Sequence, residues 1–288
     1  MDKLPIKGDT QLLAVLGDPI SHTLSPAMHN AALQALGLNC VYIPCLVRPE
    51  QLSIAVLGLK ALNFKGANVT IPHKQAIIGE LDGLFGDSSL SGSVNTIINR
   101  NGKLYGTSTD GTGLVNSLKE EGGFEVAGKN VLLLGAGGSA TAVIYSLIAA
   151  GVKSIILLNR NQENAVRLHR KVSQDTGFEL ITGGLERMEK LDWDSVDLLI
   201  NATSVGLKDR RSLVPRRFLR RNIFVYDLVY RSGEVTTLIE EARKAGCATL
   251  SGLSLLLYQG AESFRLWFEI EPPIKVMRKA LKISDSGG

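Results

Sequence analysis

The sequence predicts an α/β fold in two domains, one built on a mostly parallel sheet and one doubly wound. The chain has 288 residues, which is enough for about two domains of roughly 150 residues each. Strand-like and helix-like segments alternate along it, as in parallel sheets covered by helices. A glycine-rich turn joins a strand to a helix near the middle of the chain. We expect residues 1–111 and 254–288 to form the first, α/β domain and residues 112–253 to form the second.

Periodicity places five strands in the first domain. They are predicted at 12–16, 41–45, 66–70, 94–98 and 103–105. Ser25-Pro26 predicts the start of a helix that reaches about Leu36, because serine caps helices and proline fits their first position. A second helix is predicted at 50–62. Residues 99–102, which end in glycine, predict a hairpin turn between the last two strands.

The second half repeats this rhythm with stronger apolar runs. Its strands are predicted at 131–134, 154–158, 198–200, 224–227 and 248–250. Helices are predicted at 254–268 and 274–281, after the last strand. The Asp-Gly-Thr-Gly segment at 110–113 marks the junction between the two domains.

The composition excludes several classes of protein. With 44% hydrophobic and 21% charged residues, the chain is a globular protein rather than a disordered one. The formal charge of +4 is too small to attract a polyanion by net field alone. The basic run at 208–221 lacks the repeated aromatic residues of a single-strand platform. We therefore expect this run to be a solvated surface or the rim of a small-ligand site, and we expect no nucleic acid partner.

The cysteines and the chain start favour a cytoplasmic protein. Cys40, Cys45 and Cys247 make neither a disulfide framework nor a spaced set of metal ligands. The N-terminus lacks the apolar segment of a secretory signal. The uncharged stretch 131–152 has the length of a membrane span, but its glycines divide it into a strand, a turn and a helix. We expect no membrane partner.

The glycine-rich turn fits the dinucleotide-binding pattern G-x-G-x-x-G/A. It comprises Gly135, Ala136, Gly137, Gly138, Ser139 and Ala140. The first glycine permits the tight turn, the second lets backbone amides reach a pyrophosphate, and the small sixth residue allows close packing of helix on strand. The phosphates would lie at the positive end of the helix. The alternative is a glycine-rich turn without a ligand.

The end of the next strand bears on the choice of cofactor. NAD-binding proteins more often carry an acid there to bind the ribose hydroxyls, whereas this chain has Asn159-Arg160. A guanidinium can bind a 2′-phosphate, which favours NADP. Arg160 could instead be an ordinary solvated arginine.

Four segments of the first domain carry polar groups where loops are predicted. They are 21–26, 68–74, 93–96 and 108–111. Loops beyond the carboxyl ends of parallel strands can line one pocket, and this set would suit a polyhydroxylated carboxylic acid. Each residue also has a structural explanation: Ser25 as a helix cap, Asp110 as a turn residue, Lys74 and Gln259 as solvated side chains. Asn95 is harder to dismiss, because asparagine is disfavoured within strands.

These segments together resemble shikimate dehydrogenases. The resemblance covers residues 12–281 in colinear order. It rests on the segments 17–30, 68–74, 94–96, 109–111, 135–138, 201–204 and 259–261. It implies a two-domain enzyme of aromatic amino acid biosynthesis that interconverts 3-dehydroshikimate and shikimate with NADP, active as a monomer or a homodimer.

The resemblance also implies roles for individual residues. Lys74 and Asp110 match the catalytic pair, and Thr23 and Ser25 match the hydroxyls that hold the substrate carboxylate. The other positions expected to contact substrate are Thr70, Asn95, Tyr230 and Gln259. The cofactor side is expected to include Asn201, Thr203, Ser204 and Gly252. In ketone reduction, a lysine ammonium can supply the proton or stabilise the developing alkoxide, and Asp110 could orient it.

Two departures from the family pattern keep alternatives open. Thr23 stands where serine is usual, so the preference between shikimate and quinate is unsettled. Asn161 and Asn164 replace two residues of the usual phosphate motif, which leaves mixed use of NADP and NAD open. The alternatives are a quinate/shikimate dehydrogenase with relaxed cofactor choice and a sensor that binds a dinucleotide without catalysis.

Overall fold

The computed structural model describes residues 6–86, 88–231 and 234–283. Backbone contacts divide the chain into two compact units. The first unit contains the residues up to 113 and those from 256 onward, and the second contains residues 114–255. The boundaries fall inside two helices, α4 (Asp110–Glu120) and α8 (Gly252–Phe268).

The first unit is built on a six-stranded sheet of order β2-β1-β3-β5-β6-β4. Its strands are β1 (Gln11–Gly17), β2 (Cys40–Leu46), β3 (Gly66–Val69), β4 (Gly83–Leu84), β5 (Thr96–Arg100) and β6 (Lys103–Thr107). β1 pairs in parallel with β2 and β3, and β4 with β6, whereas β5 runs antiparallel to β3 and β6. The sheet is therefore mixed with parallel pairs in the majority, as predicted.

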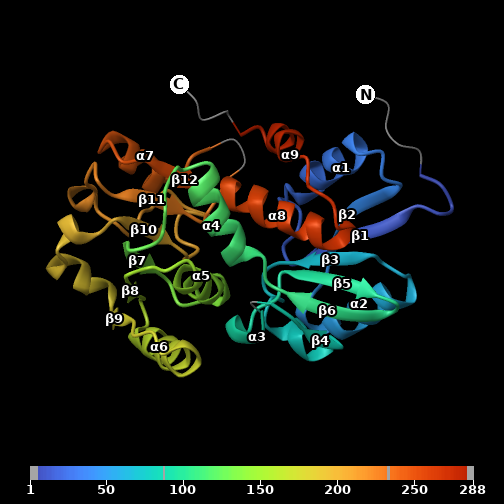
Figure 1. Cartoon of the computed structure of the whole chain (residues 1–288), viewed down its shortest axis with the longest axis horizontal. Coiled ribbons are helices and arrows are strands. Elements are labelled where there is room, and N and C mark those ends of the chain that lie inside the picture. Colours follow the sequence, from blue (N-terminus) through green and yellow to red (C-terminus); the bar gives the residue numbers. More distant parts are fainter. Residues whose placement is uncertain (1–5, 87, 232–233, 284–288) are drawn as a thin grey trace. The chain divides into compact units, whose positions relative to one another are not determined.

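Helices cover both faces of this sheet. They are α1 (Ser25–Ala35), α2 (Leu52–Ala61), α3 (Ser88–Ser91) and α9 (Ile274–Ala280), with short 3-10 turns at Pro49–Gln51 and Ala76–Glu80. α1 and α9 pack against each other (Figure 1). Val56 and Leu59 of α2 pack on Leu16, Val69 and neighbouring side chains of the sheet. Burial of these apolar side chains supplies the main driving force for the fold of the unit.

The second unit is the doubly wound domain that the sequence predicted. Its strands are β7 (Asn130–Leu134), β8 (Ser154–Leu158), β9 (Ile181–Gly183), β10 (Leu198–Asn201), β11 (Phe224–Asp227) and β12 (Thr249–Ser251). They are all parallel, in the order β12-β11-β10-β7-β8-β9. This order is typical of dinucleotide-binding domains, with the topological switch point between β7 and β10.

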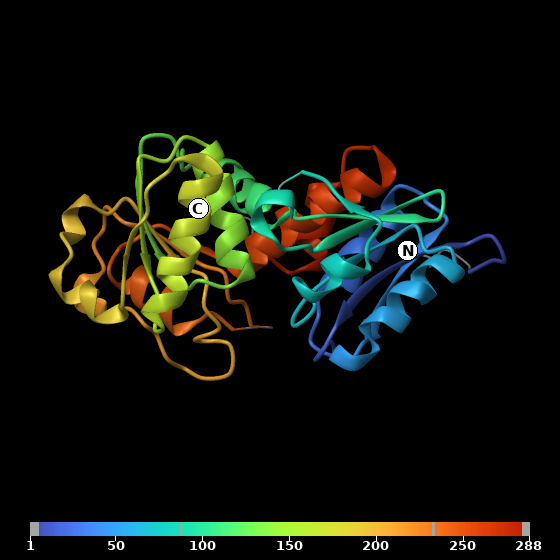
Figure 2. The same cartoon turned by 90° about the horizontal axis from the view of Figure 1, so that it is seen from below.

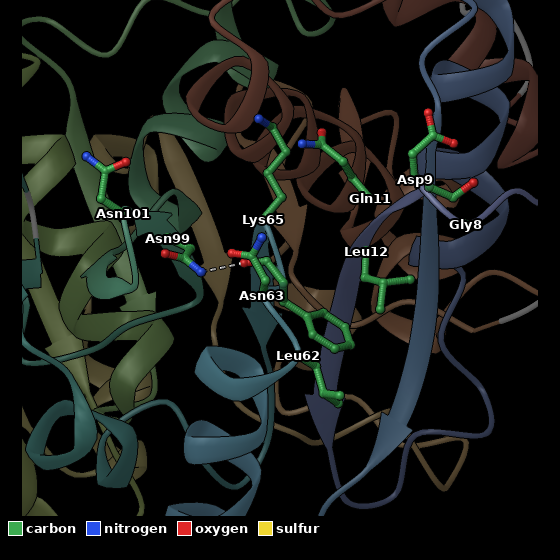
Figure 3. Close-up of a pocket in the computed structure, with 11 residues that line it drawn as sticks. Gly8, Asp9, Gln11, Leu12, Leu62, Asn63, Lys65, Asn99 and Asn101 are labelled. Atoms are coloured by element: carbon green, nitrogen blue, oxygen red, sulfur yellow. Dashed lines mark hydrogen bonds between the residues drawn. The ribbon is translucent and has the colours of Figure 1, made fainter.

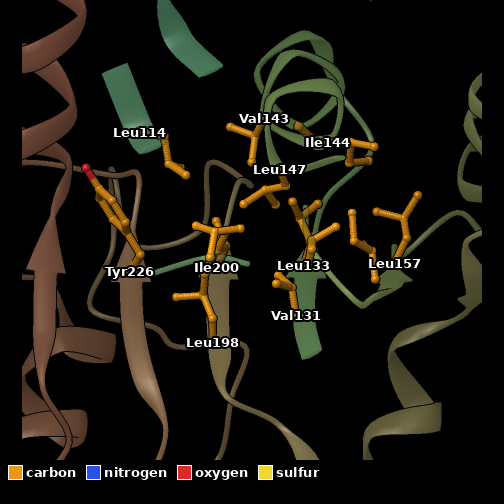
Figure 4. Packing of buried hydrophobic residues seen from close by; sticks show 14 of the residues in the cluster. Leu114, Val131, Leu133, Val143, Ile144, Leu147, Leu157, Leu198, Ile200 and Tyr226 are labelled. Carbon is orange, nitrogen blue, oxygen red and sulfur yellow. The ribbon is translucent and has the colours of Figure 1, made fainter. Parts of the chain in front are cut away.

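Two cores hold the second sheet, one on each face. Val131 and Leu133 of β7 point to the face covered by α5 (Gly138–Ala149) and α6 (Gln162–Thr176), as Figure 4 shows for part of this core. Leu132 and Leu134 point to the face covered by α7 (Thr237–Lys244) and the 3-10 turns Leu185–Lys190, Trp193–Ser195 and Arg216–Phe218. Burial on both faces explains the continuous apolar run of β7.

The helices α5 and α6 lie side by side (Figure 2). The Tyr145 hydroxyl donates to the Asp175 carboxylate, and Lys171 Nζ donates to the same carboxylate at 2.8 Å. No helix among the described residues is long and apolar enough to cross a membrane.

Several element boundaries differ from the prediction. Ser25 is the first residue of α1 rather than its cap: Leu24 holds the cap position, and Thr23 Oγ1 accepts the Ser25 N–H at 3.3 Å. The Thr23 hydroxyl therefore binds the first N–H of the helix, and the Ser25 hydroxyl does not act as the predicted cap. The strand predicted at 94–98 begins at Thr96, which leaves Asn95 in the preceding loop, and the helix predicted at 50–62 begins as a 3-10 turn. The short strands β4 and β9 were not predicted.

Candidate active site and cofactor site

Strand direction brings three loops of the first unit to one edge of its sheet. Thr70 follows the carboxyl end of β3. Because β5 is antiparallel to β3, with Thr96 opposite Asn68, the residue before β5 lies at this same edge. Thr96 also lies opposite Thr107 at the end of β6, so residues 108–110 join them. The sequence predicted a site at the carboxyl ends of parallel strands. In the structure, the antiparallel strand β5 brings its N-terminal end, with Asn95, to this same edge.

An ion pair lies at the centre of this edge. Lys74 Nζ is 2.5 Å from Asp110 Oδ2, and the Asp110 side chain is only 5% exposed whereas that of Lys74 is 19% exposed. Asp110 opens α4, and Lys74 lies in the turn after β3. A carboxylate at the first turn of a helix is stabilised by the helix dipole. The pair is therefore fixed on its acidic side and accessible on its basic side.

Asn95 holds Asp110 from the opposite direction. Its Oδ1 accepts the backbone N–H of Thr109 at 2.8 Å, which fixes the orientation of the amide, because a backbone N–H can only donate. Its Nδ2 then donates to Asp110 Oδ1 at 2.7 Å and to Gln259 Oε1 at 3.1 Å. The structure thus brings together the predicted residues Lys74, Asp110, Asn95 and Gln259.

Thr70 lies beside them and depends on a glycine of the neighbouring strand. A Cβ on Gly17 would lie 2.4 Å from Thr70 Cγ2, so only glycine leaves room for this side chain. Thr23 and Ser25 follow the carboxyl end of β1, which is the strand next to β3. Ser25 is buried, and no side chain caps the N-terminus of α1. Because the Ser25 N–H donates to Thr23 Oγ1 and Pro26 has no N–H, the groups that this helix start offers to an anion are mainly the hydroxyls of Thr23 and Ser25.

Behind this layer lies a second set of buried polar residues that sequence analysis did not single out individually. They are Tyr42, Asn68, Thr96 and Ser263. Asn68 could have indicated this set from the sequence, because it lies in an otherwise apolar strand and a buried amide needs hydrogen-bond partners.

A cavity lies at the opposite edge of the same sheet. It has a volume of about 620 Å³ and is lined by polar side chains, Lys65 and Asn63 among them, at the starts of β1 and β3 (Figure 3). It contains none of the predicted site residues.

The second unit has the geometry of a dinucleotide cradle at its switch point. Gly135 has φ +108° and lies so close to Ala202 that a Cβ would be 2.9 Å from its carbonyl oxygen. A Cβ on Gly137 would meet no atom within 4 Å, so the space above this residue is open. Gly137 precedes α5 without a side-chain cap, and Ala140 is buried in the core as predicted. These residues fit a pyrophosphate at the helix N-terminus.

Arg160 lies exposed just after β8. Among the described residues, no hydrogen bond or ion pair of its side chain is found. Asn159 donates through Nδ2 to the Asn161 carbonyl at 2.8 Å, and Asn161 caps α6 by accepting the Glu163 N–H at 3.0 Å. Asn161 is thus accounted for by its structural role, whereas the guanidinium of Arg160 is open to a 2′-phosphate.

The loop after β10 is held by buried groups. Asn201 Oδ1 accepts the hydroxyl of Thr203 at 2.7 Å, and its Nδ2 donates to Asp227 Oδ1 at 2.8 Å. Burial raises the pKa of Asp227, and hydrogen bonds from Thr236, Val229 and Asn201 oppose that rise. Asn201 therefore acts within the loop, which leaves the exposed Ser204 and the backbone of this loop to meet a ligand.

Tyr230 and Gly252 belong to the second unit. Tyr230 is partly buried, and burial raises the pKa of its hydroxyl. A Cβ on Gly252 would lie 2.2 Å from the Leu228 carbonyl oxygen, so this glycine permits close packing beside the segment that carries Tyr230.

The doubly wound unit and its glycine-rich turn are typical of dinucleotide-dependent enzymes, and the comparisons with known proteins agree. The family description "Shikimate dehydrogenase substrate binding domain" matches residues 15–97 and "Shikimate / quinate 5-dehydrogenase" matches residues 117–207. "Shikimate 5'-dehydrogenase C-terminal domain" matches residues 252–282. The chain belongs to the shikimate dehydrogenase family.

Relatives match over nearly the whole chain. The shikimate dehydrogenase (NADP(+)) of Methanothermobacter thermautotrophicus is 41% identical, covering 96% of this chain and 98% of the relative. A shikimate dehydrogenase solved with NADP+ has a TM-score of 0.90 and 39% identity, with 98% of each chain covered. The Listeria monocytogenes enzyme, solved with shikimate and NAD, has a TM-score of 0.89 and 37% identity, covering 97% of this chain and 100% of that one.

A quinate dehydrogenase also shares the fold. The enzyme of Corynebacterium glutamicum, solved with NAD, has a TM-score of 0.86 and 27% identity, covering 95% of this chain and 99% of that one.

Proposed function

We propose that this chain catalyses the reversible, NADP-dependent reduction of 3-dehydroshikimate to shikimate in aromatic amino acid biosynthesis, in the cytoplasm. The observation that carries the proposal is the Lys74–Asp110 ion pair, held by Asn95 at a polar sheet edge. A binding protein would not need a proton donor with an oriented carboxylate partner. The relatives named above support the same activity.

The first unit would bind the substrate. At the start of α1, Thr23 and Ser25 would supply hydroxyls for the substrate carboxylate. Thr70, Asn95 and Gln259 supply hydrogen-bonding groups for the ring hydroxyls. Tyr230 is also proposed to contact the substrate.

Lys74 would carry the proton. In the reducing direction, hydride adds to the carbonyl carbon, and the carbonyl oxygen takes a proton from Lys74 Nζ as its charge develops. Asp110 keeps the amine in place and compensates its positive charge. In the oxidative direction, neutral Lys74 accepts the hydroxyl proton.

The second unit would hold NADP, which supplies or accepts the hydride. The glycine turn, from Gly135 through Ala140, would place backbone N–H groups of α5 at the pyrophosphate. Arg160 would bind the 2′-phosphate, and the loop 201–204 would line the nicotinamide side.

Replacing Lys74 tests the assignment. In the wild-type chain we expect NADP⁺-dependent oxidation of shikimate, and in Lys74→Ala we expect kcat to fall at least about a hundredfold because the proton carrier is lost. The KM for shikimate should change only a fewfold. A large rise in KM with an unchanged kcat would assign Lys74 to binding instead.

A quinate/shikimate dehydrogenase with mixed cofactor use is the second candidate. Thr23 adds a methyl group beside the proposed carboxylate site. Asn161 caps α6 and carries no charge, so it cannot replace a cationic phosphate ligand of the family pattern. Arg160 is then the cation of that pattern at the end of β8. The neighbours solved with NAD support this alternative.

A further inference from the structure

A chain of buried hydrogen bonds leads from the interior of the first unit to the active-site ion pair. Its inner end is Tyr42, whose hydroxyl donates to Asn68 Oδ1 at 2.7 Å. The orientation of the Asn68 amide is fixed by the backbone carbonyl of Asn95, which can only accept and which Nδ2 binds at 3.0 Å. Asn68 Nδ2 also donates to Ser263 Oγ at 3.0 Å. Asn68 lies on β3 and Ser263 lies one turn after Gln259 on α8.

The chain continues through two hydroxyls. Ser263 Oγ and Thr96 Oγ1 are 2.7 Å apart, and Thr96 Oγ1 donates to Asn95 Oδ1 at 3.0 Å. Asn68 Nδ2 can only donate and Asn95 Oδ1 can only accept, so both hydroxyls between them can donate in the same direction. Asn95 then donates to Asp110, which binds Lys74.

The groups that make these hydrogen bonds are shielded from water. Thr96 and Ser263 have no exposed surface, and Tyr42 is 1% exposed. Hydrogen bonds aligned in one direction in a low-dielectric interior polarise one another. Ser263 Oγ also lies 3.0 Å from the Gln259 carbonyl oxygen; when it donates to Thr96 instead, the donors of this series all point toward the Asp110 carboxylate.

We propose that Tyr42, Asn68, Ser263 and Thr96 are positioning residues for catalysis. They hold the Asn95 amide with Oδ1 toward Thr96 and Nδ2 toward Asp110 and Gln259, so that Asp110 keeps Lys74 in place. They touch neither substrate nor cofactor. The inference rests on the proposed function, because Asp110 and Lys74 are the groups that the chain serves.

Two substitutions at Thr96 separate positioning from packing. Thr96→Val keeps the shape and removes the hydroxyl, whereas Thr96→Ser keeps the hydroxyl and removes a methyl group. We expect Thr96→Val to lower kcat for shikimate oxidation about tenfold, as the loss of one buried hydrogen bond would. The KM for NADP⁺ should stay unchanged. Thr96→Ser should keep at least about half of the wild-type kcat.

Ser263→Ala breaks the same series of hydrogen bonds at another residue, and it serves if Thr96→Val does not fold. It should lower kcat in the same way, and the double variant Thr96→Val/Ser263→Ala should be no worse than about the poorer single variant, because both break one chain. Ser88→Ala is the matched control. Within the part of the chain that the structure describes, this buried serine of the same unit donates to the backbone carbonyls of Phe85 and Gly106 and to no catalytic group. The kcat of Ser88→Ala should equal that of the wild type.

The outcomes separate the two proposals. An inactive wild-type chain would refute the proposed function itself. An active wild-type chain in which Thr96→Val and Thr96→Ser have the same kcat, or in which the effects of Thr96→Val and Ser263→Ala multiply, would refute the positioning chain and leave the proposed function standing.

Discussion

Arg160 is the residue at which the choice between the two nicotinamide cofactors can be tested. Its exposed guanidinium lies at the end of β8, where a 2′-phosphate would lie in a doubly wound domain. We expect Arg160→Ala to weaken NADP⁺ binding at least about tenfold and NAD⁺ binding less than about twofold, because only NADP⁺ carries the phosphate. Titration calorimetry measures both. Arg170→Ala, at another exposed arginine that lies on α6, is the control, and equal losses for both cofactors would remove Arg160 from this role.

His29 is a buried histidine that the proposed mechanism does not use. It lies on α1, stacked on Tyr42 with ring centroids 4.4 Å apart, and neither of its ring nitrogens has a hydrogen-bond partner among the described residues. Burial lowers its pKa from 6.5 to about 3. The ring is therefore neutral in the folded state at all ordinary pH values, and acts as an aromatic packing group.

This shift makes stability depend on pH. Below pH 6.5 the unfolded chain takes up a proton at His29, whereas the folded chain does not until about pH 3. The free energy of unfolding therefore decreases as the pH falls below 6.5. Between roughly pH 7.5 and 5.5 the free energy of unfolding should fall by about 1.4 kcal/mol more in the wild type than in His29→Phe. Urea unfolding at the two pH values measures this, and equal losses in both proteins would contradict it.

At the scale of elements, the contact between α4 and α8 sets the place of Gln259. A Cβ on Gly113 would lie 2.6 Å from the Gln259 backbone nitrogen and 2.8 Å from its Cα. We expect Gly113→Ala to cost about 1–3 kcal/mol of stability by overpacking, although alanine is the better helix former. Because Gln259 would shift, the KM for shikimate should rise.

Gly58→Ala is the matched control for this substitution. Gly58 is also helical, on α2, but a Cβ there would meet nothing within 4 Å. We expect it to stabilise the chain by about 0.5–1 kcal/mol through helix propensity alone. If Gly113→Ala stabilised the chain as much as Gly58→Ala, the close contact with Gln259 would not be a constraint.

The elements that could be predicted were those with a local signal. β8 and β11 have the predicted bounds: β8 is an apolar run between Ser154 and Asn159, and β11 is an apolar run that ends at Asp227. The turn at Asn101-Gly102 joins β5 to β6, and both of its residues have positive φ, as a two-residue hairpin requires. β9 escaped prediction because three residues carry no periodicity. The antiparallel pairing of β5 with β3 depends on tertiary contacts and has no local signature.

At the scale of the whole molecule, the sequence predicted the fold class and the charged pair but not the support behind the pair. Lys74 and Asp110 carried a motif, whereas Thr96 and Ser263 are ordinary small residues whose importance depends on where β5 and α8 meet. The basic run at 208–221 forms surface ion pairs: Arg216, Arg217 and Arg220 each lie within 4 Å of a carboxylate.

The most direct test of the account is a crossed kinetic assay. Shikimate and quinate are each combined with NADP⁺ and NAD⁺, and kcat/KM is measured from the absorbance of the reduced nicotinamide. We predict that kcat/KM for shikimate with NADP⁺ exceeds that of the other three combinations by at least about tenfold, which corresponds to about 1.4 kcal/mol of transition-state discrimination. Comparable values with quinate or NAD⁺ would favour the second candidate. Folded protein that binds NADP⁺ but oxidises neither substrate would contradict the account.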